Sequence, residues 1–165
     1  MALDRVLRLT VTPIGAPRWF QRLRLMRETR IIGDAHAPAM LSTFLASKPN
    51  ILQGYPSRLV LLAEAVERER VNFVTPRLVF SDSELLTIQA RNQIERVFGA
   101  PLFDVYGTYE TDNIGYECAD RRGYHLAIDC VVPEIVVNGR AAEPGEPGEL
   151  VCTVLHNYAM PLIRY

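Results

Sequence analysis

The chain has 165 residues, of which 48% are hydrophobic and 22% charged, and its net charge is -1. These proportions exclude a disordered or collagen-like chain, and the near-zero charge argues against a nucleic-acid partner. We expect one folded domain of ordinary size. The longest apolar runs, such as residues 59–63, are far too short to span a bilayer, and no signal-peptide pattern opens the chain. The sequence therefore predicts a cytoplasmic protein with no membrane partner.

The basic residues are almost all arginine. Of the 18 lysine and arginine residues, Lys48 is the only lysine. Arginine keeps its charge and suits ion pairs, whereas lysine can be tuned to act as a base or a mobile catalytic cation. Any lysine chemistry in this chain therefore rests on Lys48.

Predicted strands and helices alternate through the first two thirds of the chain. Alternating or continuous apolar runs predict strands within residues 6–13, 27–34, 50–57, 77–80 and 101–107. Apolar residues at helical spacing predict helices at residues 39–47, 57–70 and 81–99. This order favours right-handed crossovers and a mostly parallel sheet with flanking helices, so the fold class is α/β.

Two of these helices carry start and stop signals. Pro56 is well placed to open the helix at 57–70. Ser81 and Glu84 fit a capping box for the helix at 81–99, and Gly99 supplies its end. The expected apolar face of the helix at 57–70 consists of Leu59, Leu62, Ala63 and Val66.

The pattern of residue types changes near Gly115. Beyond it there is no helical period, and β-branched runs alternate with turns marked by Gly123, Asn138-Gly139 and residues 144–148. We therefore expect an α/β nucleotide-binding portion at residues 1–114 and a β-rich hairpin subdomain at 115–165, both within one domain.

The stretch "YGTYE" at residues 106–110 stands at the carboxyl end of a predicted strand, where open parallel sheets collect ligands. Tyr106 offers a flat face for stacking, and Gly107 lets backbone approach a ligand closely. Thr108 and Tyr109 carry hydroxyls that can donate to phosphate, and Glu110 can hold a hard cation such as magnesium. An ordinary turn contains the same residue types, so local composition leaves both interpretations open.

A longer pattern resembles a known family. "YGTYE" is similar to the Tyr-Gly-x-Thr/Ser-Glu motif of adenylate-forming enzymes. "KPNILQGYPSRLVLLA" precedes it, and "GYHLAIDCVVPEIV" and "GEPGELVCTVLHNYAMPLIRY" follow, in the order of the phenylacetate-CoA ligase branch, which includes coenzyme F390 synthetase-like and CapK-like proteins. The resemblance covers roughly residues 49–165. It implies the large N-terminal domain of an AMP-binding enzyme.

The resemblance also implies roles for individual residues. Tyr106 would stack on the adenine of ATP or AMP, Gly107 would give the nucleotide room, and Glu110 would coordinate the magnesium that bridges the phosphates. The family places Thr or Ser where this chain has Tyr109, so the contact with the α-phosphate is altered. Ser83 and Glu84 match a loop that the family presents to adenine and ribose, although a capping box explains Glu84 without a ligand.

Other family features have no counterpart in the sequence. There is no phosphate loop rich in Ser, Thr and Gly, the chain ends before the Gly-Asp pair whose carboxylate binds ribose, and Lys48 does not match the C-terminal catalytic lysine. Adenylation works by positioning and by stabilising charge at phosphorus. We therefore expect this polypeptide alone to be a central fragment with little or no activity.

Four residues in the β-rich part are potential zinc ligands: Cys118, His125, Cys130 and Cys152. A tight hairpin at residues 120–123 would place Cys118 opposite His125. His125 and Cys130 are five residues apart and point to opposite faces of a regular strand, and the short Cys-x-x-Cys spacing is missing. Buried cysteine is the alternative interpretation.

Three further residues match no motif clearly enough to assign a role. His36 at a helix start and His156 in a turn read as surface or capping histidines. Arg164 either braces the nucleotide side of the sheet, as the resemblance implies, or forms an ion pair within the β-rich part.

The sequence thus predicts part of an ATP-dependent acyl-CoA ligase, which converts a small carboxylic acid and ATP to an acyl-adenylate and passes the acyl group to coenzyme A. The alternative is a noncatalytic module, zinc-stabilised or not, that assembles with a partner chain. Exposed sheet edges are also compatible with a homodimer.

Overall fold

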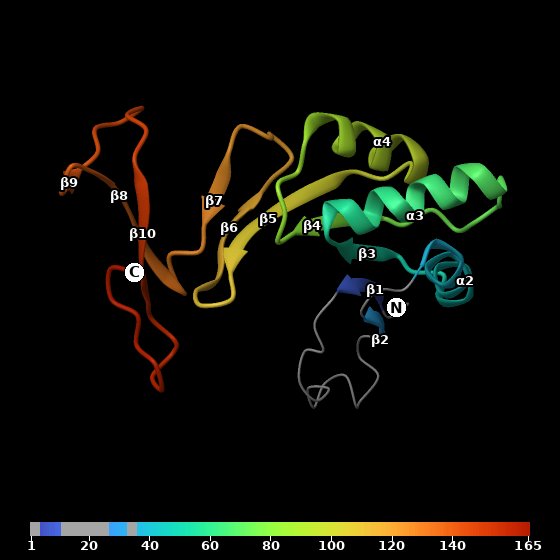
Figure 1. Ribbon diagram of the computed structural model, residues 1–165, viewed down its shortest axis with the longest axis horizontal. Helices are drawn as coiled ribbons and strands as arrows, with labels where there is room; N and C mark the ends of the chain where they lie inside the picture. Colours follow the sequence, from blue (N-terminus) through green and yellow to red (C-terminus); the bar gives the residue numbers. More distant parts are fainter. Residues whose placement is uncertain (1–3, 11–26, 33–35) are drawn as a thin grey trace. The chain divides into compact units, whose positions relative to one another are not determined.

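The computed structural model describes residues 4–10, 27–32 and 36–165 (Figure 1). The chain forms two compact units, Met1–Asp104 and Val105–Tyr165. The elements of the first unit are β1 (Arg5–Thr10), β2 (Arg27–Ile32), α2 (Ala37–Ser47), β3 (Ile51–Gly54), α3 (Pro56–Glu69), β4 (Leu78–Asp82), α4 (Ile88–Phe98) and the start of β5 (Leu102–Thr108). Each predicted strand and helix of this part is present where the structure describes it, although α4 begins later than predicted.

The first unit is built on parallel strands. β1 pairs in parallel with β2 and with β3, and β3 pairs in parallel with β4. Leu7, Leu52 and Val79 occupy matching register positions, and all three are fully buried. Because parallel strands are joined by crossovers, the helices that follow them cover a face of the sheet. The predicted parallel α/β arrangement is confirmed.

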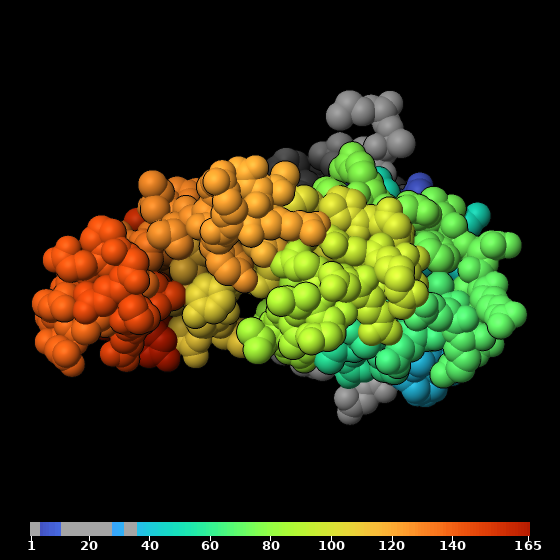
Figure 2. All heavy atoms as spheres, turned by 90° about the horizontal axis from the view of Figure 1, so that it is seen from above, coloured from blue at the N-terminus to red at the C-terminus, as the bar shows by residue number. Residues whose placement is uncertain are grey.

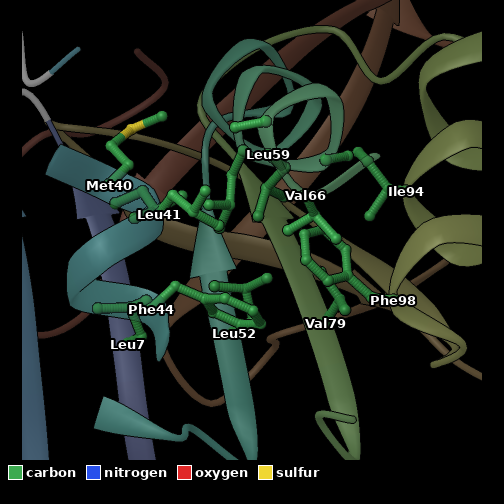
Figure 3. Close-up of a cluster of buried hydrophobic side chains, with 14 of the residues drawn as sticks. Leu7, Met40, Leu41, Phe44, Leu52, Leu59, Val66, Val79, Ile94 and Phe98 are labelled. Carbon is green, nitrogen blue, oxygen red and sulfur yellow. The ribbon is translucent and has the colours of Figure 1, made fainter. Parts of the chain in front are cut away.

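The core lies between these strands and the helices (Figure 3). Phe98 of α4 contacts two other rings, with centroid distances of 5.6 Å to Phe44 and 6.0 Å to Phe73. The predicted apolar face of α3 is buried at every position: Leu59, Leu62, Ala63 and Val66. Pro56 is the first residue of α3, as predicted. Figure 2 looks onto α4, of which Gln89, Asn92 and Arg96 are exposed polar residues.

The start of α4 differs from the prediction. The helix begins at Ile88, and the side chain of Thr87 accepts a hydrogen bond from the Ala90 amide at 3.1 Å. Ser81 instead lies in β4, where its buried hydroxyl bonds the Asp104 carboxylate. The predicted capping box is therefore wrong, because the Ser-x-x-Glu spacing falls on a strand end and a local cap stands six residues later. Gly99 ends α4 with a φ of 62°, as predicted.

The second unit contains only strands, as predicted for a β-rich segment. They are the end of β5, β6 (Asp112–Glu117), β7 (Tyr124–Leu126), β8 (Val131–Val137), β9 (Arg140–Ala141) and β10 (Glu149–Val154). All pairings among β5 to β7 and among β8 to β10 are antiparallel. The described strands form one seven-stranded sheet, in the order β2-β1-β3-β4-β5-β6-β7, and one three-stranded sheet, in the order β10-β8-β9.

β5 belongs to both units, which divide between Asp104 and Val105. The boundary expected between residues 114 and 115 rests on a change in residue pattern along the sequence, and it stays a prediction. Within the described residues, no helix is long and apolar enough to cross a membrane.

Candidate functional site

The "YGTYE" stretch forms one arm and the turn of the β5–β6 hairpin. Tyr106 lies opposite Gly115, and Thr108 lies opposite Asp112, so β5 continues through Thr108 before the chain turns at Tyr109 and Glu110. The register shifts between Tyr106 and Gly107, which marks a β-bulge. A bulge re-aims the side chains beside it, and bulges are common next to binding sites. The motif thus extends further into a strand than its sequence predicts.

Gly107 has a structural reason to be glycine. A Cβ at this position would lie 2.3 Å from the Asp112 carbonyl oxygen across the hairpin. Backbone cannot move away from such a contact without breaking the hairpin, so a side chain is excluded. The missing side chain therefore serves the hairpin itself, whatever it also offers to a ligand.

Two threonines hold the turn. The Thr108 hydroxyl accepts a hydrogen bond from the Thr111 amide at 3.1 Å, and the two hydroxyl oxygens lie 3.0 Å apart. The Thr111 hydroxyl can donate its one proton either to the Asp112 carbonyl at 3.3 Å or to the Thr108 hydroxyl. These bonds fix the turn, and the role of Thr108 as a phosphate donor stays a prediction.

The remaining motif side chains face solvent. Tyr106 is 46% exposed and Tyr109 is 78% exposed, and Glu110 is exposed at the turn. In the part of the chain that the structure describes, the Glu110 carboxylate has no ion-pair partner. One free carboxylate suits magnesium that is also held by phosphate oxygens, because magnesium keeps most of its ligands from water and substrate. The exposure of these side chains is compatible with the predicted nucleotide and magnesium roles.

Ser83 and Glu84 belong to the first unit, whereas residues 106–110 belong to the second. Both carboxylate oxygens of Glu84 are engaged at the start of α3, where they accept hydrogen bonds from the Ser57 amide at 3.0 Å and the Ser57 hydroxyl at 2.9 Å. A carboxylate is favourable there, because helix amides and the helix dipole present positive charge. Glu84 thus caps a different helix from the one its spacing predicts. Ser83 has a positive φ of 66°.

The structure does not assemble the predicted zinc site. Among the described residues, no three histidine, cysteine, aspartate or glutamate side chains come close enough to hold a metal. Tyr116, and not Cys118, lies opposite His125, and their rings stack at a centroid distance of 5.7 Å. The loop between β6 and β7 is longer than the tight hairpin expected, so the register moves and Cys118 falls outside the ladder.

Cys152 follows the alternative interpretation. Its side chain is buried in a small cluster with Ile114 and Val131, and Cys130 packs against that cluster. Burial raises the pKa of the Cys152 thiol. A protonated thiol in an apolar cluster is a packing group, because metals bind the thiolate.

Arg164 takes the second of its two predicted roles. Its guanidinium donates to the Glu134 carboxylate at 2.7 Å within the second unit. His36 precedes α2 at the N-cap position, where its side chain makes no capping bond. His156 follows β10, and its Nδ1 lies 3.3 Å from the Cys130 carbonyl oxygen.

Known proteins resemble this chain over most of its length. Phenylacetate-coenzyme A ligase of Pseudomonas putida is 32% identical over 125 residues, which are 72% of this chain and 28% of that protein. The Escherichia coli K12 enzyme of the same name is 32% identical over 126 residues and is covered to 29%. The chain is a partial homologue of phenylacetate-coenzyme A ligase. It spans less than a third of the length of these curated relatives, and no family model matches it.

Solved structures show the same fold for this homologue. A 2-hydroxyisobutyryl-CoA ligase, solved with 2-HIB-AMP and CoA, matches 98% of this chain with a TM-score of 0.81 and 21% identity, and the match covers 38% of that protein. A benzoate CoA ligase from Burkholderia xenovorans LB400 matches 95% of the chain with a TM-score of 0.70 and 17% identity, and is covered to 35%. The predicted α/β fold class is confirmed, and it matches part of a CoA ligase fold.

Sequence reasoning did not single out two residues that shape this site in the phenylacetate-coenzyme A ligase homologue. Thr111 holds the turn, and Tyr124 packs its ring against Tyr106. Thr111 has a weak local signal, since a hydroxyl three residues after Thr108 is typical of turns. Tyr124 has none, because only the register of β5, β6 and β7 brings it to Tyr106.

Proposed function

We propose that this chain is the nucleotide-binding part of an adenylate-forming acyl-CoA ligase. In this reaction a carboxylate oxygen attacks the α-phosphorus of ATP and pyrophosphate leaves; the thiol of coenzyme A then attacks the acyl carbonyl and AMP leaves. The observation that carries the proposal is the homology to phenylacetate-coenzyme A ligases, which spans 72% of the chain. An exposed tyrosine and an exposed carboxylate on one hairpin support it.

Each residue of the hairpin has a role in nucleotide binding that follows from its chemistry. Tyr106 stacks on the adenine, since a half-exposed aromatic ring suits a flat base. Glu110 holds magnesium between the phosphates, and the Thr108–Thr111 bonds fix the turn that carries it. Tyr109 directs its exposed hydroxyl to the α-phosphate in place of the threonine or serine of the family. Ser83 and Glu84 lie in the first unit, where Glu84 holds the start of α3 through its bonds to Ser57.

Calorimetric titration with ATP and magnesium tests this proposal, because binding needs only the residues of the site. Catalytic turnover is a weaker test, because this chain spans less than a third of the length of the related enzyme. We expect saturable binding that needs magnesium. Glu110→Gln removes the metal ligand at almost constant size, so we expect at least a tenfold loss of affinity in magnesium and little change without it.

Glu149→Gln is the matched control. Glu149 is an exposed glutamate in the same unit, at the start of β10 and away from the β5–β6 hairpin. It should leave ATP affinity unchanged. If the native protein releases no heat with ATP and magnesium, or if both variants bind equally well, the proposal is wrong, and a noncatalytic module becomes the better interpretation.

A further inference from the structure

Three strands of the second unit place aromatic and apolar side chains on the face that carries Tyr106. Tyr106 on β5, Gly115 on β6 and Leu126 on β7 form one row across the ladder. Tyr124 stands two residues from Leu126, and side chains two apart share a face of a strand. Tyr106, Tyr124 and Leu126 are 46%, 43% and 49% exposed, so these three side chains are accessible to solvent.

Gly115 allows Tyr124 to reach Tyr106. A Cβ at position 115 would lie 3.1 Å from the Cβ of Tyr124 and 3.1 Å from the His125 carbonyl oxygen. Any side chain on the middle strand would therefore push Tyr124 aside. Because position 115 is empty above the backbone, the ring of Tyr124 leans over β6 and meets Tyr106 at a centroid distance of 6.0 Å and an interplanar angle of 53°.

The contact restricts the ring of Tyr106. A tyrosine on an open strand samples several rotamers, and each rotamer turns its face in a different direction. Edge-to-face and tilted pairs at 4.5–7 Å are attractive, so Tyr124 favours one orientation of Tyr106. A surface ring that is already oriented loses less entropy when a flat ligand stacks on it.

We propose that Tyr124 is a positioning residue for the purine base, and that the β6–β7 hairpin thereby completes the base-binding surface of Tyr106. The proposal rests on the proposed nucleotide-binding function. It assigns a role to a residue outside the "YGTYE" stretch. It also gives a reason for Gly115, because the missing side chain leaves room for the two rings to meet.

The opposite face of the same hairpin supplies a matched control. Tyr116 and His125 lie across from each other there and stack at 5.7 Å, and Tyr116 is 51% exposed. Tyr116→Ala thus removes another half-exposed ring with an aromatic neighbour from the same ladder, but on the face that does not carry Tyr106.

The test compares ATP with magnesium tripolyphosphate, which lacks the base, by calorimetry on the full chain. We expect Tyr124→Ala to weaken ATP binding about fivefold and to leave tripolyphosphate binding unchanged. Tyr124→Phe keeps the ring and should bind ATP like the native protein, as should Tyr116→Ala. Thermal melting of each variant checks its fold, and Tyr124→Leu, which keeps apolar bulk without a ring, replaces Tyr124→Ala if the latter melts early.

The outcomes separate this proposal from the one it rests on. If the native protein binds ATP and Tyr106→Ala abolishes binding while Tyr124→Ala and Tyr124→Leu do not weaken it, the positioning role is wrong and the nucleotide site stands. An equal loss for ATP and tripolyphosphate also overturns it, because the effect then lies in the hairpin and not at the base. If the native protein binds neither ligand, both proposals fail.

Discussion

The two units of this chain are stabilised very differently. In the first, helices and parallel strands bury one continuous cluster that includes 17 fully or almost fully buried residues among those described. In the second, the corresponding cluster has three: Ile114, Val131 and Cys152. Burial of apolar surface is the main favourable term in folding, so the first unit supplies most of the stability.

The exposed groups show the reverse distribution. The proposed ligand-binding side chains Tyr106, Tyr109 and Glu110 all lie in the second unit, on a hairpin held by hydrogen bonds and a glycine contact. Binding surfaces are drawn from the less stable parts of proteins because they must stay accessible. The comparison shows that a large core can hold one end of β5 in place while the other end of the same strand stays exposed for ligand binding.

The largest effect should come from the first core. Phe98 is fully buried and contacts the rings of Phe44 and Phe73, so Phe98→Ala leaves a cavity beside these two rings. We expect a loss of about 3–5 kcal/mol in the free energy of unfolding, measured by denaturant titration. Leu85→Ala, at a side chain that is 87% exposed, should change it by less than about 0.5 kcal/mol. Equal effects would mean that this cluster is not the main source of stability.

A smaller effect is expected where β4 meets β5. Ser81 is fully buried, and its hydroxyl bonds the carboxylate of Asp104, the last residue of the first unit. Ser81→Ala removes one donor from a buried carboxylate and should cost about 1–3 kcal/mol. Ser42→Ala is the control, because that exposed hydroxyl only bonds a carbonyl of its own helix at 2.9 Å. A cost for Ser81→Ala no greater than for Ser42→Ala would contradict a stabilising role for this bond.

These two regions also differ in how far the sequence predicts them. The apolar spacing of α3, its Pro56 start and the Gly99 end of α4 are local signals, and each is confirmed. The capping box failed because Ser81 serves a long-range contact with Asp104 that local spacing cannot reveal. In the second unit the strand content was predictable from β-branched runs, whereas the register was not.

Register decides the proposed site. A loop longer than expected between β6 and β7 puts Tyr116 opposite His125, which separates the four predicted zinc ligands and brings Tyr124 to Tyr106. A shift of one residue would turn each of these side chains to the other face. The candidate binding residues at 106–110 could therefore be predicted from the sequence, but the residues that support them could not.

The turn of the β5–β6 hairpin offers a test within the second unit. Thr108→Val keeps the shape of the side chain but removes the hydroxyl that accepts from the Thr111 amide and is hydrogen-bonded to the Thr111 hydroxyl. We expect a loss of about 0.5–1.5 kcal/mol, seen as faster hydrogen exchange at the Thr111 amide. Thr108→Ser restores the hydroxyl and should return exchange to near the native rate. Unchanged exchange in Thr108→Val would show that the hairpin ladder alone fixes the turn.

A weaker, pH-dependent effect is expected at the far end of the same unit. The Arg140 guanidinium bonds both carboxylate oxygens of Glu146, at 2.8 and 2.9 Å. This contact, with the Glu143 amide, lowers the pKa of Glu146 from its ordinary 4.5. Since the folded value is the lower one, the contribution is complete above about pH 4.5 and is lost as the pH falls through the folded pKa.

Acid titration of the melting temperature, with Arg140→Gln as the comparison, measures this contribution. The native protein should lose its small advantage over the variant below about pH 4.5. High salt should shrink the advantage at neutral pH, because the pair is exposed. An advantage that grows on acidification would have the wrong sign for this pair.

The smallest effect should follow metal removal. Cys152 lies in the apolar cluster with Ile114 and Val131, and burial raises the pKa of its thiol, so it is poorly suited to bind zinc as a thiolate. We expect a chelator to leave the melting temperature unchanged, and Cys152 to react with iodoacetamide more slowly than the half-buried Cys118 and Cys130. A structural zinc would instead hold the segments that carry Cys118, Cys130 and Cys152 together, and its removal would lower the melting temperature by many degrees while exposing all three thiols at once. That result would make a bound metal, rather than apolar packing, the feature that lets so small a core support the second unit.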